Sequence, residues 1–286
     1  MPSQKQIKRR ISGVSSTAQI TRAMKMVAAA KLKRAQENME RARPYTYKVH
    51  DVISSLAAHA DIEMHPLLAV REPQKIGVVS VTSDRGLCGG FNASICRRTQ
   101  KVLADFSGKQ VELFTIGRKG NDFFKKRNAT IHQHFAGVFH ALDFSQASGI
   151  GEAIADLYIN GGFDRIYLVY NEFKNAVQQR IVCEQLLPIE PAPVEAGWSP
   201  IDYIYEPDPI GVLGKLLPMY VNVQIYHVLL ESYAAEQGAR MSAMDNATEN
   251  AMELVDNLTL QYNKARQSAI TKELLEIVGG AEGLKG

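Results

Sequence analysis

The sequence is poor in cysteine and contains no long apolar run. Its 286 residues include three cysteines, Cys88, Cys96 and Cys183, which form no CxxC pair and provide neither a disulfide framework nor a zinc signature. Free cysteines of this kind indicate a reducing compartment. No run approaches the roughly 18 apolar residues that a membrane-spanning helix needs, and the N-terminus does not read as a secretory signal. Any connection to a membrane is therefore expected to go through partners.

The motifs of nucleotide-binding and catalytic sites are also missing. Neither GxGxxG nor GxxxxGK[ST] occurs, and no catalytic triad or carboxylate pair stands out. The nearest approach is TSDRGLCGGFN at 82–92, which follows a predicted strand, where phosphate-binding loops occur. We interpret this string as a tight crossover in which Gly86, Gly89 and Gly90 supply unusual backbone angles. A nucleotide-binding loop is the alternative.

The candidate reactive cysteine and the candidate metal-binding histidines are each better explained by structural roles. Cys88 is a candidate nucleophile, but no nearby histidine completes a Cys-His pair, so a structural thiol is favoured. His132 and His134 would share one face of a strand, and His140 lies close in sequence. A metal site would also need a matching carboxylate or cysteine, so scattered surface histidines are favoured. No metal or cofactor is predicted.

Charge is distributed unevenly between the two ends of the chain. Residues 1–43 hold eleven Lys and Arg against two Glu, a net charge of +9. Residues 231–286 hold five Lys and Arg against nine Asp and Glu, a net charge of −4. A basic helix can bind nucleic acid or an anionic membrane. Because no aromatic residue that would stack on bases precedes Tyr45, we favour attraction between the two ends.

The first 60 residues carry the heptad pattern of a long helix. Ser3 and Gln6 form a capping-box pattern, and Pro44 is expected to kink the helix without resetting its phase. Thirteen of the sixteen positions in two heptad rows are apolar. The rows are Ile7, Val14, Thr21, Ala28, Ala35, Ala42, Val49 and Leu56, and Ile11, Ala18, Lys25, Leu32, Met39, Thr46, Ile53 and Ala60.

Residues 209–286 repeat this pattern. Asp208 followed by Pro209 is typical of an N-cap with proline in the first turn. Fourteen of seventeen positions in the two rows are apolar or tyrosine. The rows are Leu213, Tyr220, His227, Ala234, Met241, Thr248, Val255, Tyr262 and Ala269, and Leu216, Val223, Leu230, Gln237, Met244, Ala251, Leu258 and Ala265. At 1.5 Å per residue the two helices would be roughly 80 and 100 Å long.

Helices of this length need a partner for their apolar stripes. Pairing the first helix with the last, antiparallel, satisfies both stripes at once. A strict seven-residue repeat also predicts a left-handed coiled coil. The alternative is two separate amphipathic helices that pack on a globular body.

Residues 75–187 have the alternating pattern of an α/β domain with a largely parallel sheet. Buried strands are predicted at 75–83, 111–117 and 164–173, and helices near 92–106, 117–127 and 145–161. The predicted fold class is α/β, with a Rossmann-like layered domain inserted between the two arms of the coiled coil. The expected segments are a helix at 1–60, the α/β domain at 75–187, a proline-rich linker at 188–208 and a helix at 209–286.

Five strings distributed over the whole chain resemble the gamma subunit of F-type ATP synthases. They are TAQITRAMKMVAAAKLKRAQ (17–36), TSDRGLCGGFN (82–92), YIYEPDP (203–209), ARMSAMDNATENA (239–251) and YNKARQSAITKELLEIVGGAEGL (262–284). The resemblance begins near residue 5, which leaves no room for a transit peptide and favours the bacterial type over the mitochondrial one. The cysteine pair that regulates chloroplast members is not expected, because only Cys183 lies near its position.

The resemblance implies a non-catalytic rotor subunit. One copy per complex would thread a hexamer of three alpha and three beta subunits, bind the epsilon subunit and sit on the c ring. Proton flow would turn the ring and the shaft, and the shaft would drive the beta subunits through their catalytic states. The expected location is peripheral, at the cytoplasmic face of the bacterial inner membrane.

Matching strings also imply contact residues. Contacts with the beta and alpha subunits would be made by Met24, Lys25, Arg240, Arg266, Gln267 and Thr271. Lys25 occupies a heptad row, which a charge should avoid, so a functional contact where the helices splay would explain it. A low-friction tip would consist of Ile277, Val278, Gly279, Gly280, Ala281 and Leu284, with a frayed helix end as the alternative. Tyr205 and Glu206 resemble the part that faces the c ring and epsilon.

Three function classes therefore stay open. The first is the rotor shaft, the second is a coiled-coil protein of nucleic-acid handling, and the third is a nucleotide-using α/β enzyme with a helical arm. The shaft is favoured.

Overall fold

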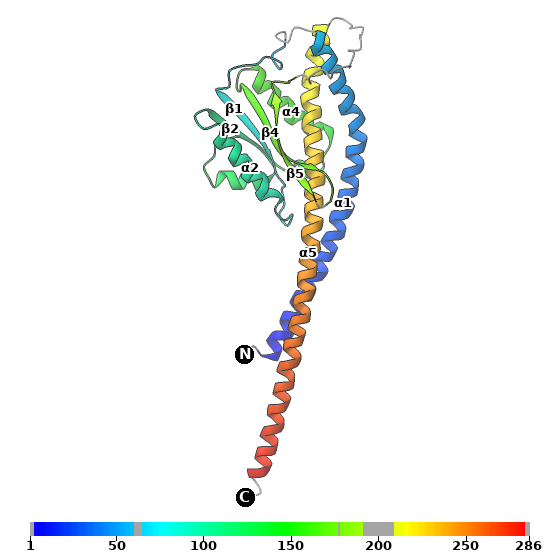
Figure 1. Cartoon of the computed structure of the whole chain (residues 1–286), viewed down its shortest axis with the longest axis vertical. Coiled ribbons are helices and arrows are strands. Elements are labelled where there is room, and N and C mark those ends of the chain that lie inside the picture. The colour runs from blue at the N-terminus through cyan, green and yellow to red at the C-terminus, as the bar shows by residue number, and fades with distance from the viewer. Residues whose placement is uncertain (1–2, 60–64, 177, 191–208, 284–286) are drawn as a thin grey trace. The chain divides into compact units, whose positions relative to one another are not determined.

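The computed structural model describes residues 3–59, 65–176, 178–190 and 209–283 (Figure 1). The chain divides into two compact units. One consists of Met1–Val27 with Met241–Gly286, and the other of Ala28–Arg240. Each long helix contributes to both units. The predicted 188–208 linker lies almost wholly outside the described residues.

Helix α1 (Gln4–His59) begins at the capping box that the sequence predicts. The Gln6 backbone N–H donates to Ser3 Oγ over 3.3 Å, and the Ser3 backbone N–H donates to Gln6 Oε1 over 3.0 Å. Two of the N–H groups that a helix start leaves without partners are satisfied in this way. The helix has 56 residues, or about 84 Å at the usual rise.

Helix α5 (Pro209–Gly283) has 75 residues, or about 112 Å at the same rise. It starts at Pro209, where the missing N–H costs nothing in the first turn. Asp208, its predicted N-cap, lies outside the described residues. No helix in the described part of the chain has both the length and the apolar character to cross a membrane.

The buried face of both helices follows the predicted heptad rows. Every row member whose side chain is described is buried or half-buried. The pattern is sharpest between residues 251 and 270, where all positions outside the rows are exposed. Ala35 and Ala251 are 1% and 8% exposed, so small residues in the rows allow a close approach of the two backbones.

Within each unit, α1 and α5 run antiparallel. In the first unit Gln4 Nε2 donates to the Ala265 carbonyl over 3.3 Å, and the hydroxyls of Thr21 and Thr248 lie 2.7 Å apart. In the second unit the Tyr45 hydroxyl meets Met219 Sδ at 3.4 Å. In the first unit, later residues of α1 thus meet earlier residues of α5. The hand of any supercoil stays a prediction.

The second unit contains a five-stranded sheet with the order β3-β2-β1-β4-β5. The strands are β1 (Lys75–Val81), β2 (Gln110–Ile116), β3 (Ile131–Phe135), β4 (Arg165–Phe173) and β5 (Gln179–Leu187). The first four are parallel, and β5 returns antiparallel to β4. The three predicted strands and the largely parallel sheet are confirmed. The β4–β5 hairpin was not predicted, because β5 mixes polar and apolar residues without strict alternation.

Helices cover both faces of the sheet, as the alternation of strands and helices predicts. They are α2 (Phe91–Asp105), α3 (Arg118–Lys125) and α4 (Phe144–Ile159), with a short 3-10 turn, η2 (Val138–His140). Along β1, Ile76 and Val78 join the core against α2 and α3, whereas Val79 and Val81 join the core against α4 and α5. This strand is therefore buried on both faces, as expected of a central parallel strand.

One glycine fixes how the loops at the carboxyl ends of β1 and β2 meet. Gly117, directly after β2, has a φ of 88°. A Cβ at this position would overlap the carbonyl oxygen of Thr82, the first residue after β1. Gly108 also has a positive φ, 96°, but a Cβ there would meet nothing within 4 Å. A side chain at Gly108 would therefore meet backbone strain alone, whereas one at Gly117 would meet both strain and steric overlap.

We therefore expect Gly117→Ala to destabilise the chain by about 2 kcal/mol more than Gly108→Ala. Both variants carry the strain of a positive φ, but only the first also forces two loops apart. Urea unfolding of the two variants and the wild-type chain measures the difference. Equal losses of stability in the two variants would show that the loops move apart without a measurable loss of free energy.

Candidate functional site

The glycine-rich loop of residues 82–92 differs from its prediction in one respect. Gly89 has a positive φ of 56°, but Gly86 and Gly90 do not. Gly90 is the N-cap of α2 with a φ of −80°, so its backbone is already close to helical. The second left-handed residue is Leu87, with a φ of 63° and a side chain that is 63% exposed. The crossover thus turns at Leu87 and Gly89.

Hydrogen bonds within the loop hold this conformation. Ser83 Oγ donates to the Arg85 carbonyl over 2.6 Å, and Asn92 Oδ1 accepts from the Ser83 backbone N–H over 2.9 Å. Asn92 Nδ2 lies 3.2 Å from Cys88 Sγ. Cys88 is 2% exposed, and burial raises the pKa of its thiol. A buried thiol that ionises less readily fits the structural interpretation of Cys88.

Two side chains of helix α5 reach the carboxyl edge of the sheet. In doubly wound sheets ligands bind outside this edge, where the strand order changes direction, here between β1 and β4. Glu231 Oε2 accepts from the backbone N–H of Phe173, the last residue of β4, over 2.8 Å. Arg240 Nη2 donates to the carbonyl of Gly86, in the loop after β1, over 3.2 Å. Side chains of α5 therefore bind the backbone groups at this edge.

Arg240 also forms an ion pair within α5. Its Nη1 lies 2.6 Å from Glu236 Oε1, and the two side chains are only 12% and 6% exposed. Burial raises the pKa of the Glu236 carboxyl, and Arg240 opposes that rise. Removing one partner from such a buried pair costs about 3–5 kcal/mol. Arg240, predicted to contact a partner subunit, is directed at its own chain in this structure.

Lys25 also has an internal partner. Its Nζ lies 2.6 Å from Asp245 Oδ1, and the two side chains are 40% and 42% exposed. This pair explains why a charge is tolerated in a heptad row. Because the pair is exposed, its contribution to stability is about 0–1 kcal/mol. Its cation remains accessible to solvent.

The other predicted contact residues lie towards the two helix ends. Met24 is half-buried, and Arg266, Gln267 and Thr271 are exposed. The Thr271 hydroxyl donates to the Gln267 carbonyl over 2.9 Å. Each position from 271 to 280 is exposed. Leu284, Tyr205 and Glu206 lie outside the described residues, as does the side chain of Ala281.

The uncovered end of α5 carries four exposed large apolar side chains beside the exposed pair of Lys272 and Glu276. Ile277 and Val278 are 68% and 58% exposed, and Leu274 and Leu275 are 57% and 67% exposed. In the same unit, α1 starts at Gln4, whose side chain reaches Ala265. Beyond that level α5 has no helix beside it in the described part of this unit.

Two of the three histidines that the sequence singles out, His132 and His134, lie against residues of the neighbouring strand β2. His132 Nδ1 lies 2.7 Å from Glu112 Oε2, and His134 Nδ1 lies 3.0 Å from Thr115 Oγ1. Among the described residues, no three His, Cys, Asp or Glu side chains are arranged to hold a metal ion.

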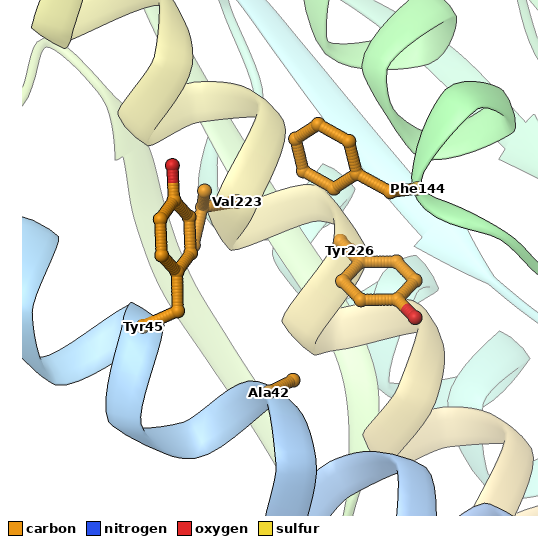
Figure 2. Close-up of a pocket in the computed structure, with 5 residues that line it drawn as sticks. All are labelled: Ala42, Tyr45, Phe144, Val223 and Tyr226. Carbon is orange, nitrogen blue, oxygen red and sulfur yellow. The ribbon is translucent and has the colours of Figure 1, made fainter.

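An apolar pocket of about 380 Å³ opens between α1, α4 and α5 (Figure 2). It is lined by Ala42, Tyr45, Phe144, Val223 and Tyr226. The Phe144 and Tyr226 rings meet edge to face at 5.6 Å. The only polar side-chain groups in this lining are the phenol hydroxyls of Tyr45 and Tyr226.

The sequence interpretation missed Glu231, Glu236 and Asp245, which anchor α5 or pair with α1. A signal was present for the first two, because they are carboxylates within the mainly apolar stretch 228–239. Glu231 is 5% exposed, and burial raises the pKa of its carboxyl, while its bond from Phe173 opposes the rise. His227 Nε2 lies 4.0 Å from Glu231 Oε1, and burial lowers the pKa of that imidazole.

We expect the free energy of unfolding of Glu231→Gln, relative to that of the wild-type chain, to increase as pH rises. The folded-state pKa of Glu231 is raised, so its contribution is present below the unfolded pKa and is lost as pH rises through the folded pKa. Glutamine keeps an acceptor for Phe173 but does not ionise. Urea unfolding at about pH 4.5 and pH 8 compares the variant with wild type. Exposed Glu253→Gln on the same helix is the control. A difference that does not change with pH would contradict the assignment.

Comparisons with known proteins agree with the geometry. The family model described as ATP synthase matches residues 3–284. The ATP synthase gamma chain of Chlorobium phaeobacteroides is 50% identical, with both chains covered completely. The central stalk/c-ring structure of the Tetrahymena thermophila mitochondrial ATP synthase is 26% identical, with a TM-score of 0.65 over 80% of this chain and 99% of that chain.

A second structure supports the fold alone. The Euglena gracilis mitochondrial ATP synthase, OSCP/F1/c-ring, contains a chain that is 21% identical. It has a TM-score of 0.74 and covers 98% of this chain and 94% of that chain. The parallel-dominated sheet and the two long terminal helices are thus found together in related assemblies. With identity near one half over its whole length, the chain belongs to the ATP synthase gamma chain family.

Proposed function

We propose that this chain is the central-stalk rotor subunit of a proton-translocating F-type ATP synthase. In this role it couples rotation of the c ring to conformational cycling of the catalytic beta subunits and has no active site of its own. Its partners would be three alpha and three beta subunits, the epsilon subunit and the c ring. Membership of the gamma chain family supports this role, as does the likeness to a chain of a central stalk/c-ring structure.

The observation that carries the proposal is the uncovered end of α5. Four large apolar side chains there, Leu274, Leu275, Ile277 and Val278, are more than half exposed. Leaving them in water forfeits about 1.5–3 kcal/mol for each side chain. An apolar sleeve formed by alpha and beta subunits would cover them without ion pairs that hold one angle. The proposed bearing tip runs through Gly279, Gly280 and Ala281 to Leu284.

The proposed contacts with alpha and beta are Met24, Lys25, Arg266, Gln267 and Thr271. Exposure of the last three and solvent access to the Lys25 ammonium support this assignment. Arg240 belongs to the same set by sequence, and its role is taken up below. For coupling, these contacts must differ between the conformations of beta, since otherwise rotation could not shift their equilibria.

The proposal also includes the finer architecture. The two helices would form a left-handed coiled coil, because the heptad repeat is strict. The segments would be 1–60, 75–187, 188–208 and 209–286, with Tyr205 and Glu206 on the side of the c ring and epsilon. The complex would place this chain peripherally at the cytoplasmic face of a bacterial inner membrane.

Co-purification and charge reversal test this function. The chain should assemble tightly with alpha and beta subunits and should hydrolyse no ATP alone. In a complete complex in vesicles, we expect Lys25→Glu to lower proton pumping per ATP several-fold while assembly persists, because the exposed Lys25–Asp245 pair contributes little stability. Exposed Lys33→Glu on α1 is the matched control.

A charge swap separates the two roles of Lys25. Lys25→Asp with Asp245→Lys restores the internal pair but moves the cation to α5, so coupling should stay impaired. Normal coupling in Lys25→Glu would contradict the contact. Recovery in the swap would show that Lys25 acts only through Asp245.

A further inference from the structure

Arg240 differs from the exposed contact residues because its guanidinium binds groups of its own chain. Its guanidinium connects two elements of the second unit: Glu236 on α5, at 2.6 Å, and the Gly86 carbonyl, at 3.2 Å. With 12% of its side chain exposed, little of it remains for a partner subunit. A planar guanidinium can satisfy a carboxylate and a carbonyl at once, which an ammonium does less well.

The loop that Arg240 binds has a strained backbone at Leu87, and the apolar side chain of that residue is exposed. Leu87 has a φ of 63°, which is unfavourable for a bulky residue. In the same loop, Ser83 Oγ donates to the Arg85 carbonyl, Asn92 Nδ2 contacts the Cys88 thiol, and Cys88 is buried. Backbone strain of this kind persists only where surrounding contacts over-determine it. The bond from Arg240 to Gly86, the residue before Leu87, is one of those contacts.

Negative charge around the loop makes the position of this cation important. Asp84 Oδ1 accepts from the backbone N–H groups of Arg118 and Gly137, over 3.1 and 3.4 Å. Asp84 Oδ2 is buried and has no hydrogen-bond partner in the described part of the chain. The Asp84 and Glu236 charges repel each other, whereas Arg240 and, more weakly, Lys31 attract Glu236. Arg240 therefore offsets a carboxylate repulsion while it binds the loop.

We propose that Arg240 is a positioning residue that holds the loop of residues 84–90 on α5 and thereby presents Leu87 to solvent. It acts on rotation through this loop. The part that concerns rotation rests on the proposed function; the attachment of the loop does not.

The buried thiol of Cys88 reports on the attachment in the free full-length chain. Iodoacetamide labelling, read by mass spectrometry, gives the rate at each cysteine. We expect Arg240→Gln to accelerate labelling of Cys88 by about tenfold or more, the effect of losing a hydrogen bond to a charged group. Cys96, equally buried on α2, should keep its wild-type rate. An unchanged Cys88 rate, or equal acceleration at both cysteines, would overturn the proposal.

A charge swap distinguishes the loop contact from the ion pair. Glu236→Arg with Arg240→Glu restores the pair within α5 but removes the donor to Gly86. We expect Cys88 to label as fast in the swap as in Arg240→Gln. A return to the wild-type rate would show that only the ion pair matters and would overturn the proposal.

The route through the loop is tested in the assembled complex by combining Arg240→Gln with Leu87→Ala. If Arg240 acts through Leu87, the two losses of proton pumping per ATP will be less than additive. Additive losses would point to a direct contact of Arg240 and overturn this route. A complex that shows no coupling even with wild-type chain would refute the proposed function, while the labelling result would stand.

Discussion

The structure depends on the burial of heptad rows that lie at opposite ends of the chain. Neither α1 nor α5 can bury its stripe alone, and α1 precedes the sheet whereas α5 follows it. Pairing the two helices buries both apolar stripes. Because one helix precedes the sheet and the other follows it, the α/β domain becomes an insertion between them. Row positions from 251 to 270 are the only ones withdrawn from solvent in that stretch. Beyond residue 270 the pairing leaves Leu274, Leu275, Ile277 and Val278 exposed, and the bearing tip is proposed in that stretch.

A second set of contacts gives α5 a role in the sheet domain as well. Glu231 and Arg240 bind backbone groups at the carboxyl ends of β4 and β1. This edge is where a doubly wound domain usually receives its ligand. One helix therefore serves as half of the helix pair and also supplies side chains that bind this edge of the sheet. The same arrangement explains how buried carboxylates persist on α5, since each has a donor nearby.

Periodicity predicted the long helices and the parallel strands, because both signals extend over many residues. The capping box at Ser3 was predicted from two residues, since its bonds are local. Contacts between segments that are distant in the sequence could not be predicted from it. Nothing in the sequence around Lys25 indicated Asp245, and nothing around Arg240 indicated Gly86. Leu87 escaped prediction because glycine is the residue expected at a positive φ, and here leucine adopts it. The exposed contact residues came from resemblance alone.

The proposed function requires this chain to turn inside a ring of alpha and beta subunits. It is tested most directly by fixing an alpha–beta complex to a surface, attaching a probe to the α/β domain of this chain, and adding ATP. The account predicts rotation in one direction, with three dwell positions per turn, one for each beta subunit. A complex that hydrolyses ATP at its normal rate while the probe stays at one angle would contradict it.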